Sequence, residues 1–196
     1  MPFLRSIAGH AGLALAFTTL FAWGCSGGER GPTPEEEVAA LGIEVTSSAF
    51  KEGARIPTKH TCDWENTSPP LKWSGVPQDT KSIALISDDP DAPGGTWVHW
   101  VLYALPPDVT ELLEDVPKND ELASGARQGT TDFMRTGYRG PCPPAGHGVH
   151  RYYFKVYALD TSLGLDAGAT KSDLLSAMKG HILAEGRLMG TYERRD

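Results

Sequence analysis

Residues 82–105 read SIALISDDPDAPGGTWVHWVLYAL, and this stretch decides the fold class. Two apolar segments of strand length, 82–87 and 97–105, flank a loop made mostly of aspartate, proline and glycine. Apolar or alternating segments that end at proline and glycine are typical of β-strands. Three further segments have the same character, namely 43–46, 151–159 and 187–193. The sequence therefore predicts a mainly β fold.

The strand predicted over 97–105 divides its side chains between two faces, because successive residues of a strand point to opposite sides. Strict alternation places on the face of His99 the residues Trp97, Val101 and Tyr103. It places on the opposite face the residues Val98, Trp100, Leu102 and Ala104. In the strand 151–159, Tyr152 begins an apolar row that continues with Phe154, Val156 and Ala158. We expect histidine and tyrosine to form the mouth of a pocket with an apolar floor.

One segment departs from the β pattern. Ser172 is a candidate helix cap, and the apolar residues that follow at helical spacing are Leu174, Leu175, Met178 and Ile182. This spacing predicts a short peripheral helix over 172–184, ahead of the last strand. Residues 117–125 are a candidate for another turn of helix.

The first 24 residues predict an export signal. Arg5 is their one charged residue, and the apolar stretch 11–23 is too short to span a bilayer as a mature helix. Cys25 follows Gly24, as lipoprotein processing requires, although Trp23 fits the processing site poorly. We expect a lipidated Cys25 that anchors the protein in the cell envelope, in the periplasm or at the surface. The alternative is ordinary cleavage nearby, with Cys25 unlipidated.

Residues 25–41 are rich in glycine, proline and glutamate and predict a flexible tether after the lipidated cysteine. The remaining residues, 42–196, have the length of one domain. Without residues 1–24 the chain has 17 Lys and Arg against 25 Asp and Glu, a formal charge of −8. This balance argues against nucleic acid as a partner and leaves the lipid as the means of membrane attachment.

Two cysteines remain once Cys25 is assigned to the anchor. In an oxidising compartment, Cys62 and Cys142 could form a disulfide. The alternative is two free buried thiols.

Three motifs in order carry a family resemblance. They are DPDAP at 89–93, the W-x-H of 97–99, and GPCPPxGxxxHRY at 140–152. Together with supporting context such as HWVLYALP at 99–106 and HILAEGRLMGTYER at 181–194, they resemble the phosphatidylethanolamine-binding protein family, in its bacterial Raf-kinase-inhibitor-like branch. The resemblance covers residues 43 to 194.

The resemblance implies two antiparallel sheets in a Greek-key-like sandwich with a few peripheral helices. It also implies a cavity that accepts phosphate, acetate or a phospholipid head group. Asp89 and His99 match the carboxylate and imidazole of that cavity, Asp91 matches its second carboxylate, and Tyr152 matches its hydroxyl. The residues that match the opposite wall are Pro144 and His150. Cys142 stands where many relatives outside this branch have glycine, and Trp64 replaces an expected small residue.

A carboxylate beside a bound anion is repulsive unless it is protonated or paired with a cation. We therefore expect Asp89 to orient and charge an imidazole, either His99 or His150. The imidazole N–H, the Tyr152 hydroxyl and loop amides would then hold the anion. The sequence therefore predicts a binding protein, with neither a catalytic residue nor a cofactor.

Three other functions compete with anion binding. A metal could use His99, His147, His150, Asp89 and Asp91, but their spacing matches no standard zinc motif. A hydrolase would need an activated nucleophile, and neither a G-x-S-x-G elbow nor a serine or cysteine beside a candidate base is present. An envelope protease inhibitor or protein-interaction module remains an alternative, and no segment identifies its partner.

Overall fold

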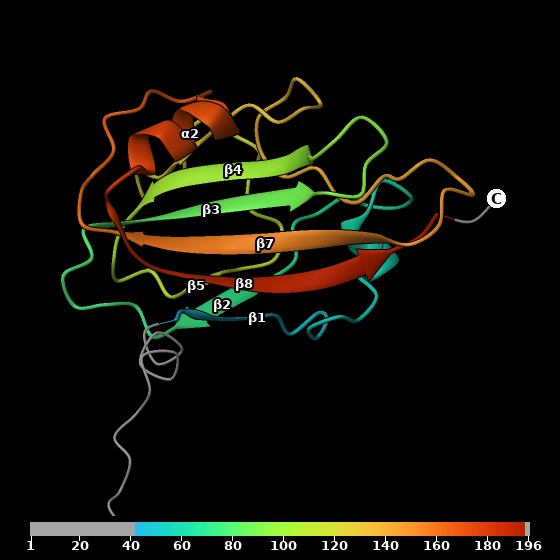
Figure 1. Cartoon of the computed structure of the whole chain (residues 1–196), viewed down its shortest axis with the longest axis horizontal. Coiled ribbons are helices and arrows are strands. Elements are labelled where there is room, and N and C mark those ends of the chain that lie inside the picture. Colours follow the sequence, from blue (N-terminus) through green and yellow to red (C-terminus); the bar gives the residue numbers. More distant parts are fainter. Residues whose placement is uncertain (1–41, 195–196) are drawn as a thin grey trace, which may run out of the picture.

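The computed structural model describes residues 42–194, so the predicted signal, the tether and Cys25 lie outside it. Two antiparallel sheets make up the fold (Figure 1). The smaller sheet has the order β1 (Glu44–Thr46), β2 (Leu71–Ser74), β5 (Glu111–Leu112). The larger has the order β6 (Arg127–Gln128), β4 (Trp97–Leu105), β3 (Ser82–Asp89), β7 (His150–Leu159), β8 (Ile182–Tyr192). The mainly β prediction with two sheets is confirmed.

The larger sheet is covered on both faces. On one face it packs against the smaller sheet, and this core contains among others Val45, Trp73, Leu102, Phe154 and Val156. The other face packs against α2 (Lys171–Met178), which lies beside β4 in Figure 1. A single 3-10 turn, η1 (Thr58–His60), precedes β2. Within residues 42–194, no helix has the length and apolar character needed to cross a membrane.

Two bulges in β4 overturn the strict alternation expected for this strand. Its pairing with β3 shifts by one residue between Ser87 and Asp88 and again between Ile83 and Leu85. At the first shift, His99 is the extra residue. Val101 and Tyr103 consequently lie in the α2-facing core with Val98, whereas Trp100 and Leu102 lie in the core between the sheets. A bulge re-aims the side chains that follow it, and no periodicity in the sequence reports it.

The helix predicted over 172–184 is present, but its predicted end is wrong. Thr170, rather than Ser172, caps α2 through a capping box with Asp173. The helix ends at Met178, before Gly180, whose φ of 82° breaks helical geometry. Residues from Ile182 onward belong to β8, because they pair with β7 along its length. Residues 117–125 form no helix, and β2, β5 and β6 were not predicted.

Candidate functional site

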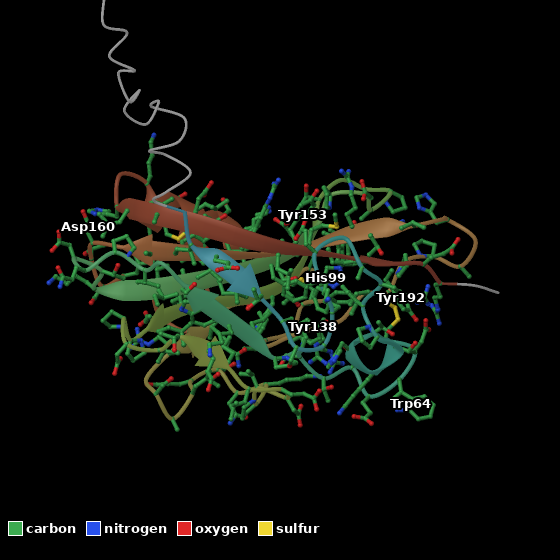
Figure 2. All side chains as sticks on the ribbon, turned by 90° about the horizontal axis from the view of Figure 1, so that it is seen from below. Trp64, His99, Tyr138, Tyr153, Asp160 and Tyr192 are labelled. Atoms are coloured by element: carbon green, nitrogen blue, oxygen red, sulfur yellow. A yellow bond between two sulfur atoms is a disulfide. The ribbon has the colours of Figure 1, made fainter. Side chains whose placement is uncertain are left out.

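A small pocket lies at the end of the sandwich where β3 and β4 meet the 142–149 loop. Its volume is about 200 Å³, and its lining includes Asp89, Trp97, His99, Phe133 and His150. Figure 2 shows His99 on the side of the molecule that carries Tyr192, away from Asp160. Pro144 lines the pocket as expected. The structure thus brings together four residues that the sequence placed in one site.

Asp89, at the end of β3, is almost completely buried. Its Oδ2 lies 2.7 Å from Nδ1 of His150, and its Oδ1 accepts a hydrogen bond from the backbone N–H of Asp91 at 2.8 Å. A carboxylate at this distance from an imidazole nitrogen accepts its proton in a hydrogen bond. Of the two imidazoles considered from sequence, His150 is therefore the one that Asp89 orients.

His150 continues the chain of contacts to the pocket rim. Its Nε2 lies 2.7 Å from Nδ1 of His147, an exposed residue of the 142–149 loop. Both ring nitrogens of His150 are thus engaged by protein groups. The sequence singled out His147 only as a possible metal ligand, but no group of three or more metal-type ligands occurs among residues 42–194.

His99 has a different partner. Its Nδ1 donates to the carbonyl oxygen of Arg139 at 2.7 Å, and the Arg139 N–H donates back to the carbonyl of His99 at 2.9 Å. The ring stands edge-on to Phe133 and Tyr152, with centroid distances of 5.2 Å to each. Burial lowers the pKa of His99, and the Arg139 carbonyl and the charge of Asp89 oppose that effect only in part. His99 is accordingly a neutral imidazole at neutral pH, which removes it as the cation of the site.

Tyr152 contacts the His99 ring but is not itself among the residues that line the pocket, and it is 1% exposed. Its hydroxyl makes no well-formed hydrogen bond within the described part of the chain, although the Asp89 carboxylate lies close enough to interact with it. Burial, followed by the negative charge of Asp89, raises the pKa of Tyr152 above its usual range, so the hydroxyl keeps its proton. Leaving a buried polar group unpaired costs about 1–3 kcal/mol, and a bound ligand that accepts this proton recovers the cost.

Asp91 does not line the pocket, contrary to the sequence-based assignment. Its carboxylate instead makes a bidentate pair with the Arg151 side chain, at 2.8 and 2.6 Å, and also accepts the Arg151 backbone N–H at 2.9 Å. Period-two geometry explains the difference, because Arg151 points to the face opposite Tyr152 and draws Asp91 with it. The Arg151 guanidinium lowers the pKa of Asp91 to about 2.

The Asp91 pair predicts a pH effect on stability. A carboxyl group whose pKa is lower in the folded than in the unfolded protein stabilises the fold above its unfolded pKa, here 3.8, and this contribution disappears as pH falls towards 2. We expect Asp91→Asn to flatten the decrease in thermal unfolding midpoint between pH 4 and pH 2. The exposed Asp108 provides a control, because Asp108→Asn should show the same pH profile of the unfolding midpoint as the wild type. Parallel profiles for Asp91→Asn and the wild type would contradict the assignment.

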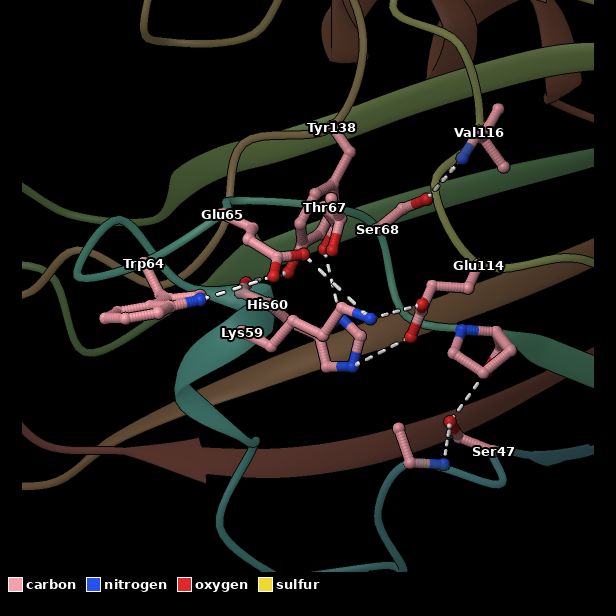
Figure 3. A network of polar contacts seen from close by, with 12 residues as sticks. Ser47, Lys59, His60, Trp64, Glu65, Thr67, Ser68, Glu114, Val116 and Tyr138 are labelled. Carbon is pink, nitrogen blue, oxygen red and sulfur yellow. Dashed lines mark hydrogen bonds and ion pairs between the residues drawn. The ribbon is translucent and has the colours of Figure 1, made fainter.

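The 138–142 segment, which carries the Arg139 carbonyl, is held by the 58–68 loop. The Tyr138 hydroxyl donates to the carbonyl of His60, and Gly140 N–H donates to the Asn66 side chain, each at 2.7 Å. Figure 3 shows Tyr138 reaching towards His60. The disulfide between Cys62 and Cys142, expected from sequence, is present with a Cα–Cα distance of 5.3 Å. The pocket wall therefore has both a covalent and a hydrogen-bonded attachment to this loop.

The 58–68 loop has its own buried network, which the sequence analysis missed. His60 is 2% exposed, its Nδ1 donates to the carbonyl of Thr67 at 3.1 Å, and its Nε2 lies 3.8 Å from Glu114 (Figure 3). Glu114 also pairs with Lys59 at 2.6 Å. Trp64 projects from this loop with 70% of its surface exposed, away from the pocket lining. These contacts give the loop a structural role in supporting the pocket wall.

A larger groove of about 870 Å³ runs beside α2, where its lining includes Met134, Leu175 and Ile182. None of its lining residues is among those with a buried, unpartnered side-chain polar atom. The small pocket, by contrast, is lined by Asp89, His99 and His150, and the His99 ring contacts Tyr152. We therefore place the functional site at the small pocket.

Comparisons with known proteins agree with the fold described above. The sequence model of the family described as phosphatidylethanolamine-binding protein matches residues 46–193. The UPF0098 protein of Methanothermobacter thermautotrophicus is 54% identical over 152 residues, which cover 78% of this chain and 99% of that protein. The UPF0098 protein of Pyrococcus horikoshii is 46% identical over 185 residues, covering 93% and 88%.

Two solved structures resemble the chain closely. Escherichia coli YbcL, described as a member of the mammalian PEBP family, is 38% identical with a TM-score of 0.73 and covers 78% of this chain and 99% of its own. The phosphatidylethanolamine-binding protein homologue of Chlamydia trachomatis is 44% identical with a TM-score of 0.71, covering 79% and 99%.

Proposed function

Because this chain belongs to the phosphatidylethanolamine-binding protein family, in the branch of YbcL, we propose that its small pocket binds a small anionic group such as phosphate or a phospholipid head group. The observation that carries the proposal is the pocket lined by Asp89, His99 and His150, together with the buried Tyr152 hydroxyl, which makes no well-formed hydrogen bond and interacts with Asp89. A donor of this kind at a small cavity matches an oxyanion as ligand.

The size of the pocket limits the ligand. Sites for drug-sized molecules typically measure about 300–1,000 Å³, and this pocket measures about 200 Å³. Its enclosed part therefore fits a head group or a small acid rather than a whole lipid. Pro93, Pro143 and Pro144 in its wall restrict the backbone, so that the pocket forms at little cost in conformational entropy.

We propose binding without turnover. The lining contains neither serine nor threonine, and Cys142 takes part in the disulfide, so the described lining offers no activated nucleophile of those types. Export and lipid anchoring through Cys25 remain part of the proposal and rest on the sequence. The disulfide supports an oxidising compartment.

Tyrosine substitutions test the proposal in a matched pair. We expect Tyr152→Phe to weaken binding of inorganic phosphate about 10- to 100-fold, because a hydrogen bond to a charged group is worth about 1.5–3 kcal/mol. Tyr153→Phe should bind like the wild type, because Tyr153 lies on the opposite face of the sheet, between Lys155 and Arg187. Calorimetric titration at pH 6 measures both. Equal affinities of the two variants would refute the role of the Tyr152 hydroxyl.

A further inference from the structure

The backbone determines which nitrogen of His99 carries the proton. A carbonyl oxygen only accepts hydrogen bonds, so the 2.7 Å contact to Arg139 requires the proton on Nδ1. In the neutral imidazole, Nε2 is then a bare acceptor. The close side-chain hydrogen bond of His99 is the one at Nδ1, the Gly140 backbone also lies near enough to the ring to raise its pKa, and His99 lines the pocket. The pocket therefore presents the lone pair of Nε2. An unprotonated oxygen of a bound anion would place a second lone pair against it.

The lysines and arginines around the pocket do not compensate the second negative charge of a dianionic ligand. Asp89 is the one acidic side chain in the described lining of the pocket, and no lysine or arginine lines it. Among cations on neighbouring segments, Arg151 pairs with Asp91, and Lys155 and Lys171 pair with Asp88. Arg139, whose Nε makes no hydrogen bond within the described residues, does not line the pocket.

His150 cannot replace them as a donor to the ligand. Its Nδ1 proton is directed at Asp89, and its Nε2 contacts His147. The prolines of the wall lack an N–H. The groups that face His99 are Asp89 from β3, Tyr152 and His150 from β7, Trp97 from its own strand, and Phe133 and the Arg139 carbonyl from the 130–142 segment. Of these, the Tyr152 hydroxyl and the Trp97 indole N–H are the donors left for a ligand.

We propose that the pocket selects oxyanions that carry an acidic proton, in particular phosphate and phosphomonoester monoanions, over dianions and phosphodiesters. The P–O–H group of such a ligand donates to Nε2 of His99, and an unprotonated oxygen accepts from the Tyr152 hydroxyl. A phosphodiester has no P–O–H, so its oxygens would meet the His99 lone pair unless the buried imidazole were protonated. This inference depends on the proposed function and narrows it, because the head-group phosphate of most phospholipids is a phosphodiester.

A pair of isomers tests the requirement for the proton. Ethyl phosphate and dimethyl phosphate have the same composition, and at pH 5 both are monoanions, but only ethyl phosphate has a P–O–H. Calorimetric titration of the wild-type protein at pH 5 should show ethyl phosphate binding at least about tenfold more tightly, as expected when an acceptor loses its donor. Equal binding of the isomers would overturn the inference and leave the proposed function standing. Failure of inorganic phosphate and both esters to bind at any pH would refute both.

The pH dependence of the affinity shows whether the required proton belongs to the ligand or to a group of the protein. The second pKa of a phosphomonoester is about 6, so the affinity for ethyl phosphate should fall about tenfold per pH unit between pH 7 and pH 8. For methylphosphonate, which has a higher second pKa, the fall should begin at a correspondingly higher pH. If the midpoint were the same for both ligands, a protein group would be responsible and the inference would fail.

A substitution assigns the selectivity to His99. His99→Phe keeps a ring at this position but removes the acceptor, and it should abolish the preference for ethyl phosphate over dimethyl phosphate. His181→Gln is the control, because His181 is exposed and pairs with Asp160 far from the pocket (Figure 2). It should keep the wild-type preference. If His99→Phe unfolds, the wild-type titrations still decide the inference, whereas a folded His99→Phe protein with unchanged preference would overturn it.

Discussion

Replacing Asp89 with alanine is expected to lower the free energy of unfolding by about 3 kcal/mol. The carboxylate accepts one hydrogen bond from His150 and one from the backbone of Asp91, and both donors would remain buried or half-buried without a partner. Hydrogen bonds to charged groups contribute about 1.5–3 kcal/mol each, and buried donors left unpaired account for much of that cost. In a chain of this length the loss corresponds to a decrease of about 6–12 °C in melting temperature.

Asp160 provides the control, because it makes the same type of contact in an exposed position. Its Oδ1 lies 2.8 Å from Nδ1 of His181, and both side chains are more than 40% exposed. Exposed ion pairs contribute about 0–1 kcal/mol, so Asp160→Ala should change the unfolding free energy little. Chemical denaturation of both variants measures the contrast. Similar losses for the two variants would show that burial of the Asp89 pair is not what makes it important.

Removal of the disulfide is expected to have an effect of similar size. The bond closes a loop between residues separated by 80 positions, for which the chain-entropy model gives about 4–5 kcal/mol, while measured losses for native disulfides are about 2–5 kcal/mol. We expect the double variant Cys62→Ser/Cys142→Ser to lose about 2–4 kcal/mol. The hydrogen bonds from Cys62 to Pro141 and from Gly140 to Asn66 would still join the two segments, and they should preserve the fold.

Reduction separates the loss of the bond from the effects of the substitutions. Dithiothreitol should lower the unfolding free energy of the wild-type protein to about that of the double variant and should leave the double variant unchanged. Because the 138–142 segment carries the carbonyl that orients His99, we also expect weaker phosphate binding by the reduced protein. An unfolding free energy of the wild type that does not respond to reduction would contradict the expected stabilisation.

Local sequence patterns were sufficient for the main elements of the fold. Apolar segments bounded by proline and glycine located β1, β3, β4 and β7 to within about two residues. They failed for β2, β5 and β6, which are two to four residues long. The two-residue strands β5 and β6 contain too few residues to establish a period, and they form because neighbouring strands supply their hydrogen bonds. The start of β8 was missed for a related reason, since pairing with β7 overrides the helical spacing of Ile182.

The sequence by itself determined which residue types gather at the site, because DPDAP, W-x-H and GPCPPxGxxxHRY each join a proline-rich loop to the end of a strand. Only the tertiary structure decided how these residues are paired. The bulge at His99 turns that ring towards Tyr152, the Arg139 carbonyl assigns its proton, Asp89 takes His150 as partner, and Arg151 removes Asp91 from the pocket. Each of these contacts joins residues at least 40 positions apart. Their geometry follows from strand register and loop packing, which no local pattern in the chain encodes.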